Sequence, residues 1–262
     1  MDLGIKNRVA IIGGSSKGLG KGCAISLAKE GVNIVLCAND KLSLENTANE
    51  IRNLGVDVLP LLVDMSSSKD NELIITKTIK KFGNIDILIN NSGGPKPGTF
   101  FDMNDEDWDK AYNDILKYVI RLNRLAIPYM KKNKWGRIIN ITSLSVKEPA
   151  DSLILSNVFR SGVVSMAKTL SRELITENIT INNICPGAFK TDRAIELMAV
   201  AAQKQNTTIK DIEANSVKNL PLGRFQTPKE LGDLVTFLCS DLAKGITGTT
   251  TQIDGGISSG LL

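Results

Sequence analysis

The sequence contains no histidine among its 262 residues. This absence excludes a Ser-His-Asp triad, a histidine general base and any histidine-ligated metal. Cysteine is sparse, because only four residues of this type occur, far apart and without a Cys-x-x-Cys pair: Cys23, Cys37, Cys185 and Cys239. Such spacing predicts buried, reduced thiols, and neither a disulfide framework nor a bound metal is expected.

Long apolar runs are also missing. No stretch approaches the roughly 18 apolar residues of a membrane helix, and Met1 to Asn7 has no hydrophobic region typical of a signal peptide. We therefore expect a cytoplasmic protein that does not bind membranes. The net charge of +4 comes with no basic tract, which argues against nucleic acid as a partner.

The hydrophobic pattern alternates between strand and helix. Strand-like runs lie near 8–13, 33–38, 57–63, 85–89, 136–142, 179–185 and 249–253. This alternation predicts an α/β fold, a Rossmann-type doubly wound parallel sheet of about seven strands. No linker divides the chain, so we expect one domain over 1–262. Residues 188–217 show helical patches and no strand, and we expect a helical lid there.

A glycine-rich loop follows the first strand-like run. After Arg8 to Ile12 come Gly13-Gly14-Ser15-Ser16-Lys17-Gly18-Leu19-Gly20, and then a helical pattern. Glycines let the backbone approach a pyrophosphate, whose charge is stabilised by free N–H groups at a helix N-terminus. Taken alone, the segment is also compatible with an ordinary strand-to-helix turn.

Further landmarks follow in a fixed order. They are Asp64, Asn90-Asn91-Ser92-Gly93, Asn140-Ile141-Thr142-Ser143, Pro186-Gly187, Leu222-Gly223-Arg224-Phe225, Gly245-Ile246-Thr247-Gly248 and Asp254-Gly255-Gly256. With the glycine loop, they make the sequence resemble the short-chain dehydrogenase/reductase family, and its 3-oxoacyl-carrier-protein reductase-like members in particular. The resemblance implies hydride transfer between a nicotinamide cofactor and a small carbonyl or alcohol substrate. It also implies a homotetramer, paired through helices 105–132 and 152–177.

The resemblance implies the cofactor contacts as well. They are Gly14, Ser16, Lys17, Gly18, Leu19, Gly20, Asn39, Asp64, Met65, Asn91, Ser92, Gly93, Arg160, Pro186, Gly187, Phe189 and Thr191. Ala38 occupies the position where NAD-preferring members carry an acid, and Lys17 matches a basic residue that faces the 2′-phosphate of NADP. We therefore favour NADP(H). NAD(H) stays the alternative, because Asp40 lies only two residues beyond Ala38.

The catalytic positions depart from the family pattern of Asn, Ser, Tyr and Lys. Ser143 is present, but the Tyr position holds Ser156, the Lys position holds Arg160 and the Asn position holds Ile115. An aliphatic hydroxyl is a much weaker acid than a phenol, and a guanidinium stays protonated. We therefore expect a degenerate tetrad and an atypical active site.

Two other residues are candidates for the missing acid. Tyr118 lies near the Ile115 position, and Lys147 follows Ser143 in the loop over the cleft, so the two could form a displaced acid/base pair. The alternative is that the tyrosines pack in a subunit interface and Lys147 is solvated.

Two hypotheses for the function stay open. The first is an NAD(P)-dependent oxidoreductase whose catalytic residues are Ser143, Ser156, Arg160 and Lys147. The second is a dinucleotide-binding sensor or assembly subunit without activity.

Overall fold

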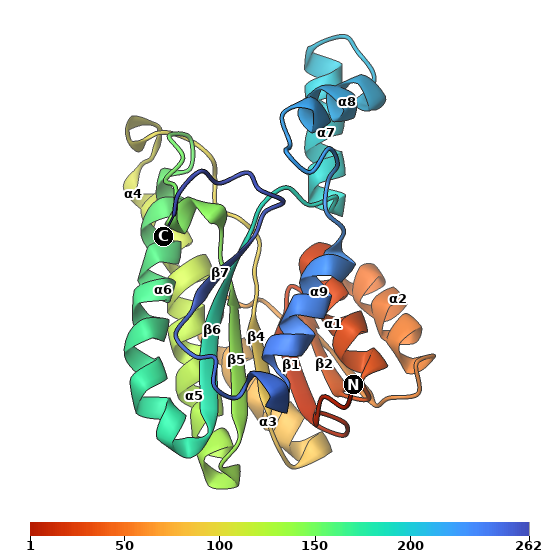
Figure 1. Ribbon diagram of the computed structural model, residues 1–262, viewed down its shortest axis with the longest axis vertical. Coiled ribbons are helices and arrows are strands. Elements are labelled where there is room, and N and C mark those ends of the chain that lie inside the picture. The colour runs from red at the N-terminus through yellow and green to blue at the C-terminus, as the bar shows by residue number, and fades with distance from the viewer. Residues whose placement is uncertain (262) are drawn as a thin grey trace.

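A computed structural model describes residues 1–261, which fold around a seven-stranded parallel sheet (Figure 1). The strands are β1 (Val9–Gly13), β2 (Asn33–Ala38), β3 (Val58–Leu62), β4 (Ile87–Asn90), β5 (Gly136–Ile141), β6 (Ile179–Pro186) and β7 (Thr250–Ile253). Their order is β3-β2-β1-β4-β5-β6-β7, so the predicted doubly wound fold is confirmed. The order reverses between β1 and β4, and ligands of such sheets bind beyond the strand ends at that point.

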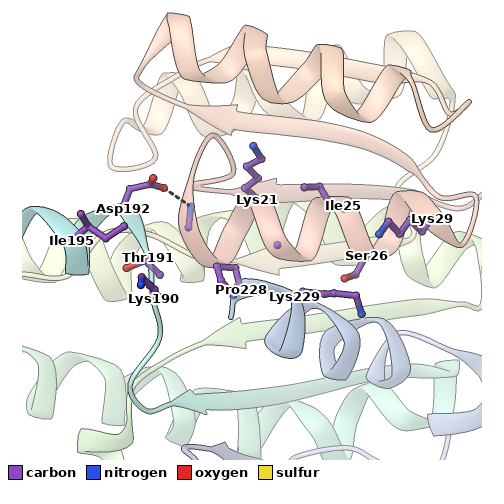
Figure 2. A pocket seen from close by; sticks show the side chains of 12 residues that line it. Lys21, Ile25, Ser26, Lys29, Lys190, Thr191, Asp192, Ile195, Pro228 and Lys229 are labelled. Atoms are coloured by element: carbon purple, nitrogen blue, oxygen red, sulfur yellow. Dashed lines mark hydrogen bonds between the residues drawn. The ribbon is translucent and has the colours of Figure 1, made fainter. Parts of the chain in front are cut away.

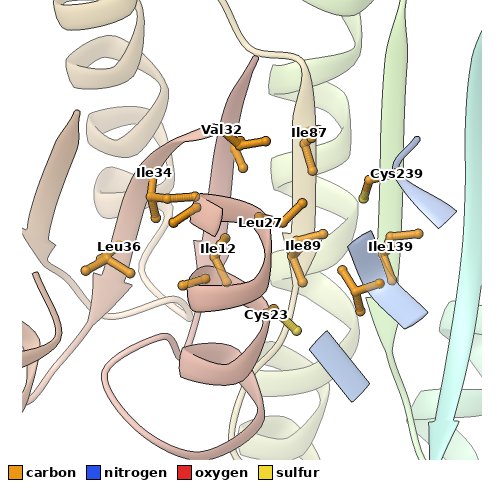
Figure 3. Close-up of a cluster of buried hydrophobic side chains, with 14 of the residues drawn as sticks. Ile12, Cys23, Leu27, Val32, Ile34, Leu36, Ile87, Ile89, Ile139 and Cys239 are labelled. Carbon is orange, nitrogen blue, oxygen red and sulfur yellow. The ribbon is translucent and has the colours of Figure 1, made fainter. Parts of the chain in front are cut away.

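Helices cover both faces of the sheet. They are α1 (Gly18–Lys29), α2 (Lys41–Arg52), α3 (Ser68–Phe82), α4 (Asp105–Ala111), α5 (Tyr118–Asn133), α6 (Ile154–Leu174), α7 (Asp192–Lys204), α8 (Ile209–Lys218) and α9 (Pro228–Leu238). Alternate residues of a strand serve opposite faces. Ile12 therefore packs in the cluster with α1 and α9 (Figure 3), and Ile11 packs in the cluster with α5 and α6. Burial on both faces explains the continuous apolar runs in the sequence.

A row of buried asparagines joins the strands near their carboxyl ends. Asn90, Asn140 and Asn183 stand opposite one another on β4, β5 and β6. Asn140 donates to Asn183 at 2.9 Å and accepts from Asn90 at 2.9 Å, and Asn90 also donates to Asn123 of α5 at 3.0 Å. These amide bonds cross three strands and one helix, so they fix the strand ends at which the candidate site lies.

The helix expected over 105–132 is not uniform. A π-helical segment, η2 (Tyr112–Lys117), separates α4 from α5. Within it, the Asp114 carbonyl accepts a hydrogen bond from the Ser92 hydroxyl at 3.0 Å. Single π-helical turns within α-helices are frequent at functional sites. The helix expected over 105–132 is therefore present as α4, η2 and α5, and the contact with the loop after β4 accompanies a wider turn that apolar spacing does not reveal.

Helices α7 and α8 form the predicted helical segment between β6 and α9, and they stand away from the sheet (Figure 1). Several apolar side chains of α7 are exposed, among them Ile195, Leu197 and Val200. This pair of helices is referred to below as the lid. In residues 1–261, no helix is both long and apolar enough to cross a membrane.

Candidate functional site

The glycine loop has the conformation that its residues predict. Gly14 and Gly18 have φ values of +54° and +53°, in the region that glycine favours. A Cβ atom at Gly20 would collide with the carbonyl oxygen of Gly14. The loop leads directly into α1, whose first N–H groups have no partner within the helix. This geometry is a cradle for an anionic group at the N-terminus of α1.

A cavity of about 310 Å³ lies on one side of this loop. Residues from the ends of β1, β2, β3 and β4 line it: Gly14, Ser16, Ala38, Asn39, Val63, Asp64, Met65, Ser66, Ser92, Gly93, Gly94, and from the helices Lys110 and Asp114. The structure therefore brings together part of the cofactor contacts that the resemblance implies: Gly14, Ser16, Asn39, Asp64, Met65, Ser92 and Gly93. These residues lie far apart in the chain but meet because parallel strands end at the same edge.

Asn91 stabilises the glycine loop through hydrogen bonds. Its side-chain amide is buried and donates to the carbonyl oxygens of Gly13 at 3.0 Å and Gly14 at 3.3 Å. The predicted cofactor residue therefore shapes the loop itself. Phe189, also predicted to face the cofactor, has a buried side chain that packs in the core with α1 and α9.

Lys17 of the glycine loop is held by an ion pair. Its ammonium lies 2.9 Å from the carboxylate of Asp40, which also caps α2 by accepting from the Ser43 N–H. The hydrogen bond from Lys17, with those from Ser43, lowers the pKa of Asp40 to about 2. Asn39, the residue before Asp40, lines the 310 Å³ cavity. Asp40 therefore orients Lys17 at the end of β2, two residues beyond Ala38, the position where the resemblance implies an acid in NAD-preferring members.

The lid contributes a carboxylate to the N-terminus of α1. Asp192 accepts a hydrogen bond from the Gly18 N–H at 3.2 Å (Figure 2). Thr191, Asp192, Arg193 and Glu196 also line a second cavity, of about 300 Å³, together with Gly14, Lys17, Gly18, Leu19 and the loop 91–94. Thr191 caps α7 by accepting from the Ala194 N–H at 3.2 Å. The structure therefore places an acidic side chain at the N-terminus of α1, where the resemblance predicts an anionic ligand.

Serine hydroxyls gather at the end of β5. Ser143 caps a short 3-10 helix, η3 (Leu144–Val146), and accepts from the Ser145 N–H at 3.1 Å. The Ser145 hydroxyl in turn lies 3.2 Å from the hydroxyl of Ser156 on α6. Both Ser145 and Ser156 are buried. Sequence analysis missed Ser145, although its position two residues after Ser143 on the loop was a usable signal.

Arg160 lies one helical turn after Ser156 and is 8% exposed. Its guanidinium donates to the Ile141 carbonyl at 2.9 Å, and no carboxylate in residues 1–261 forms an ion pair with it. Burial lowers the pKa of Arg160, while the nearby Tyr118 and Cys185 oppose this shift. A buried cation without a counter-ion favours a ligand that brings acceptor oxygens or negative charge.

Tyr118 lies next to Arg160 and not beside Lys147. Its side chain is 2% exposed. Burial raises the pKa of its phenol, and a hydrogen bond with Ser92 and the charge of Arg160 oppose the shift. In the part of the chain that the structure describes, no hydrogen bond joins Tyr118 to Lys147. The predicted displaced pair therefore lacks its contact, because η2 and the fold direct the phenol into the core.

Ile115, which the resemblance aligns with the family's asparagine, is buried. It packs in a small apolar cluster with Ala111, Leu155, Trp108 and Phe159 between η2 and α6. The position therefore serves packing in this chain and offers no polar group for a water relay.

The fold and the glycine cradle define a dinucleotide-binding α/β protein. The chain belongs to the short-chain dehydrogenase/reductase family, since the family model described as Enoyl-(Acyl carrier protein) reductase matches residues 14–258. The 3-oxoacyl-(acyl-carrier-protein) reductase FabG of Staphylococcus epidermidis is 30% identical over 254 residues, covering 96% of this chain and 99% of that protein.

Solved structures give the same family relation. The L-sorbose reductase of Gluconobacter frateurii, complexed with NADPH and L-sorbose, has a TM-score of 0.96 and 32% identity, with 100% of each chain covered. YwfH, an NADPH-dependent reductase involved in bacilysin biosynthesis, has a TM-score of 0.91 and 29% identity, with 98% of this chain and 100% of that chain covered.

Proposed function

We propose that this protein is an NADP(H)-dependent oxidoreductase that reduces a small carbonyl compound through an atypical active site. The observation that carries the proposal is the guanidinium of Arg160, which is buried and forms no ion pair with a carboxylate in residues 1–261. It lies one helical turn after Ser156, whose hydroxyl contacts that of Ser145 at the end of β5. One relative of similar structure is described as complexed with NADPH and another as an NADPH-dependent reductase, which supports the choice of cofactor.

The residues present fit a phosphorylated dinucleotide. The glycine cradle leaves no room for side chains at Gly20, which allows the backbone to approach a pyrophosphate. Lys17 would bind the 2′-phosphate, and Asp64 and Met65 would line the adenine. Pro186, Gly187 and Thr191 would lie toward the carboxamide. When bound, the reduced cofactor supplies the hydride.

At the substrate end, Ser143 and Ser156 would donate hydrogen bonds to the carbonyl oxygen. Arg160 would hold the ribose hydroxyls through its free N–H groups, and its fixed charge would stabilise the negative charge that develops on the substrate oxygen. The alkoxide would take the proton of the Ser156 hydroxyl, and Ser156 would regain a proton from water through the neighbouring Ser145 hydroxyl. Because a serine hydroxyl is a weak acid, we expect slow turnover with simple ketones.

A second candidate function is cofactor sensing without catalysis. The observation that favours it is Ile115, whose packing in an apolar cluster removes the polar relay of the family. A protein of this kind would bind NADPH and turn over no carbonyl compound.

The test of the cofactor assignment is a fluorescence titration of the protein with NADPH and NADH. We expect NADPH to bind more tightly, and Lys17→Ala to remove most of the preference. A charge-assisted contact of about 1–3 kcal/mol corresponds to a preference of about 5- to 150-fold. Lys21→Ala is the matched control, because Lys21 lies on α1 and pairs with Glu50 at 2.6 Å. Equal affinities for NADPH and NADH in the wild type would refute the assignment.

The test of catalysis is a screen of carbonyl compounds, followed by the loss of NADPH absorbance. Arg160→Met should abolish reduction while NADPH still binds through the adenosine end. Tight NADPH binding with no turnover of any carbonyl compound would instead support the sensor function.

A further inference from the structure

The first turn of the lid helix α7 lies against the glycine loop. Asp192 accepts a hydrogen bond from the Gly18 N–H at 3.2 Å (Figure 2). A Cβ atom built on Gly18 would lie 3.5 Å from the side chain of Thr191, the residue that caps α7. These two contacts hold the start of α7 beside the loop between β1 and α1. Arg193, the next residue of the helix, is therefore brought to the same place.

Arg193 lines the cavity of about 300 Å³ that the lid and the glycine loop form. Glu196 lines the same cavity, and its carboxylate lies 3.5 Å from the Arg193 guanidinium. Residues three and four positions apart share a face of a helix, so Glu196 lies on the face of α7 that carries both Asp192 and Arg193. The cavity also includes Gly14 and Lys17 of the glycine loop. The charged face of α7 is therefore directed at this loop.

The ion pair between Arg193 and Glu196 does not explain the arginine. Its side chains are 73% and 61% exposed, and ion pairs this exposed add little to stability. The ion pair of Lys17 with Asp40 at the same loop is shorter, at 2.9 Å. Arg193 is also the second residue of α7, where the helix dipole favours acidic side chains and opposes a cation. The position therefore favours a ligand that supplies negative charge.

We propose that Arg193 binds the pyrophosphate of the dinucleotide, and that Glu196 is its partner only while the cofactor is absent. This inference rests on the proposed function and adds a residue to its cofactor site. A guanidinium can donate two parallel N–H bonds to phosphate oxygens. In the proposed function Lys17 serves the 2′-phosphate, so the pyrophosphate otherwise has only the backbone N–H groups of the glycine cradle. Arg193 supplies a cation from the lid and thereby couples the lid to the bound cofactor.

The experiment is a fluorescence titration of the protein with NADPH and with NADH. Arg193→Met should raise Kd about tenfold or more for both, because both contain the pyrophosphate. Calorimetry with adenosine 2′-phosphate, which lacks the pyrophosphate, should give the same Kd for wild type and variant. Arg193→Lys should restore part of the affinity, since it keeps the charge and loses the geometry of two parallel bonds. Lys204→Met is the control and should change nothing, because Lys204 is an exposed cation at the last residue of α7.

Glu196→Gln gives the reciprocal test. Loss of its charge releases Arg193, so Kd for both dinucleotides should fall about two- to fivefold, whereas a general disturbance of the lid would raise it. A Kd that rises in Glu196→Gln, or stays unchanged in Arg193→Met, overturns the inference and leaves the proposed function standing. Weaker binding of NADPH alone in Arg193→Met assigns the guanidinium to the 2′-phosphate and also overturns it. Equal weakening of both dinucleotides supports the inference, even when no carbonyl compound is reduced and the proposed function fails.

Discussion

Removing the charge of Asp192 should tighten the binding of NADPH. This carboxylate accepts a hydrogen bond from the Gly18 N–H at 3.2 Å, at the end of α1 where the proposed function places the pyrophosphate. Asp192 therefore competes with the cofactor for the same donor. The substitution Asp192→Asn keeps the size of the side chain nearly constant and makes it neutral, so it isolates the effect of the charge.

The size of the effect follows from two contributions. An asparagine can still accept the Gly18 N–H, so the variant loses only the charge-assisted part of this hydrogen bond, on the order of 0.5 kcal/mol at an exposed site. Repulsion between the carboxylate and a phosphate several ångströms away adds less than about 1 kcal/mol near the surface. Together these predict a Kd for NADPH that is about three- to tenfold lower in the variant.

The assay is a fluorescence titration with NADPH at low and at high salt. Screening weakens the repulsion, so the gap between wild type and Asp192→Asn should narrow at high salt. Asp211→Asn is the control, since Asp211 is an exposed carboxylate of the same lid that caps α8 by accepting from Thr208. An unchanged or higher Kd in Asp192→Asn would refute the competition and would assign Asp192 a supporting role in cofactor binding.

Two further predictions concern the interior of the site. Asn140→Leu removes both amide bonds of Asn140 and leaves buried groups of Asn90 and Asn183 unpaired, so the free energy of unfolding measured with urea should fall by about 2–5 kcal/mol; a loss below about 0.5 kcal/mol would contradict the role of the asparagine row. Ser156→Tyr combined with Arg160→Lys restores a phenol beside a lysine and should raise kcat for a simple ketone about tenfold or more; a fall in kcat would show that the chain uses a different acid. Ile115→Asn is best left out of this test, because an asparagine would be buried among apolar side chains.

The strands and their order could be predicted from the sequence because burial on both faces leaves a direct signal. The run 33–38 is apolar nearly throughout and forms β2 over the same residues, Asn33–Ala38. The expected run 85–89 begins two residues before strand β4, which starts at Ile87. Ile85 is buried like a strand residue but precedes the hydrogen-bonded ladder. Parallel strands end at one edge, so the positions of Asp64 and Ser92 at strand ends sufficed to place them in one cavity.

The directions of individual side chains could not be predicted in this way. Asn91 turns toward the glycine loop, 77 or 78 residues earlier in the chain. Asp192 contacts Gly18, which is separated from it by 174 residues. Such contacts depend on the positions of the loops and the lid in the folded protein. Neither hydrophobic periodicity nor a sequence motif predicts these positions. The π-helical turn could not be predicted for the same reason, since the Asp114 carbonyl within it accepts a hydrogen bond from the Ser92 hydroxyl, 22 residues earlier in the chain.

The residues that the resemblance aligns with the family's catalytic positions have neighbours of matching polarity in the structure. Ser156 has a hydroxyl partner in Ser145, and Ile115 has apolar neighbours on α6 such as Leu155. Arg160 is the exception, because its charge is buried without a carboxylate in residues 1–261. Packing alone does not explain a buried guanidinium, since an apolar side chain of similar length would fill the same space without the free-energy cost of removing a charge from water. Local violations of this kind are expected at functional sites. The buried guanidinium therefore favours an active site over a cofactor sensor.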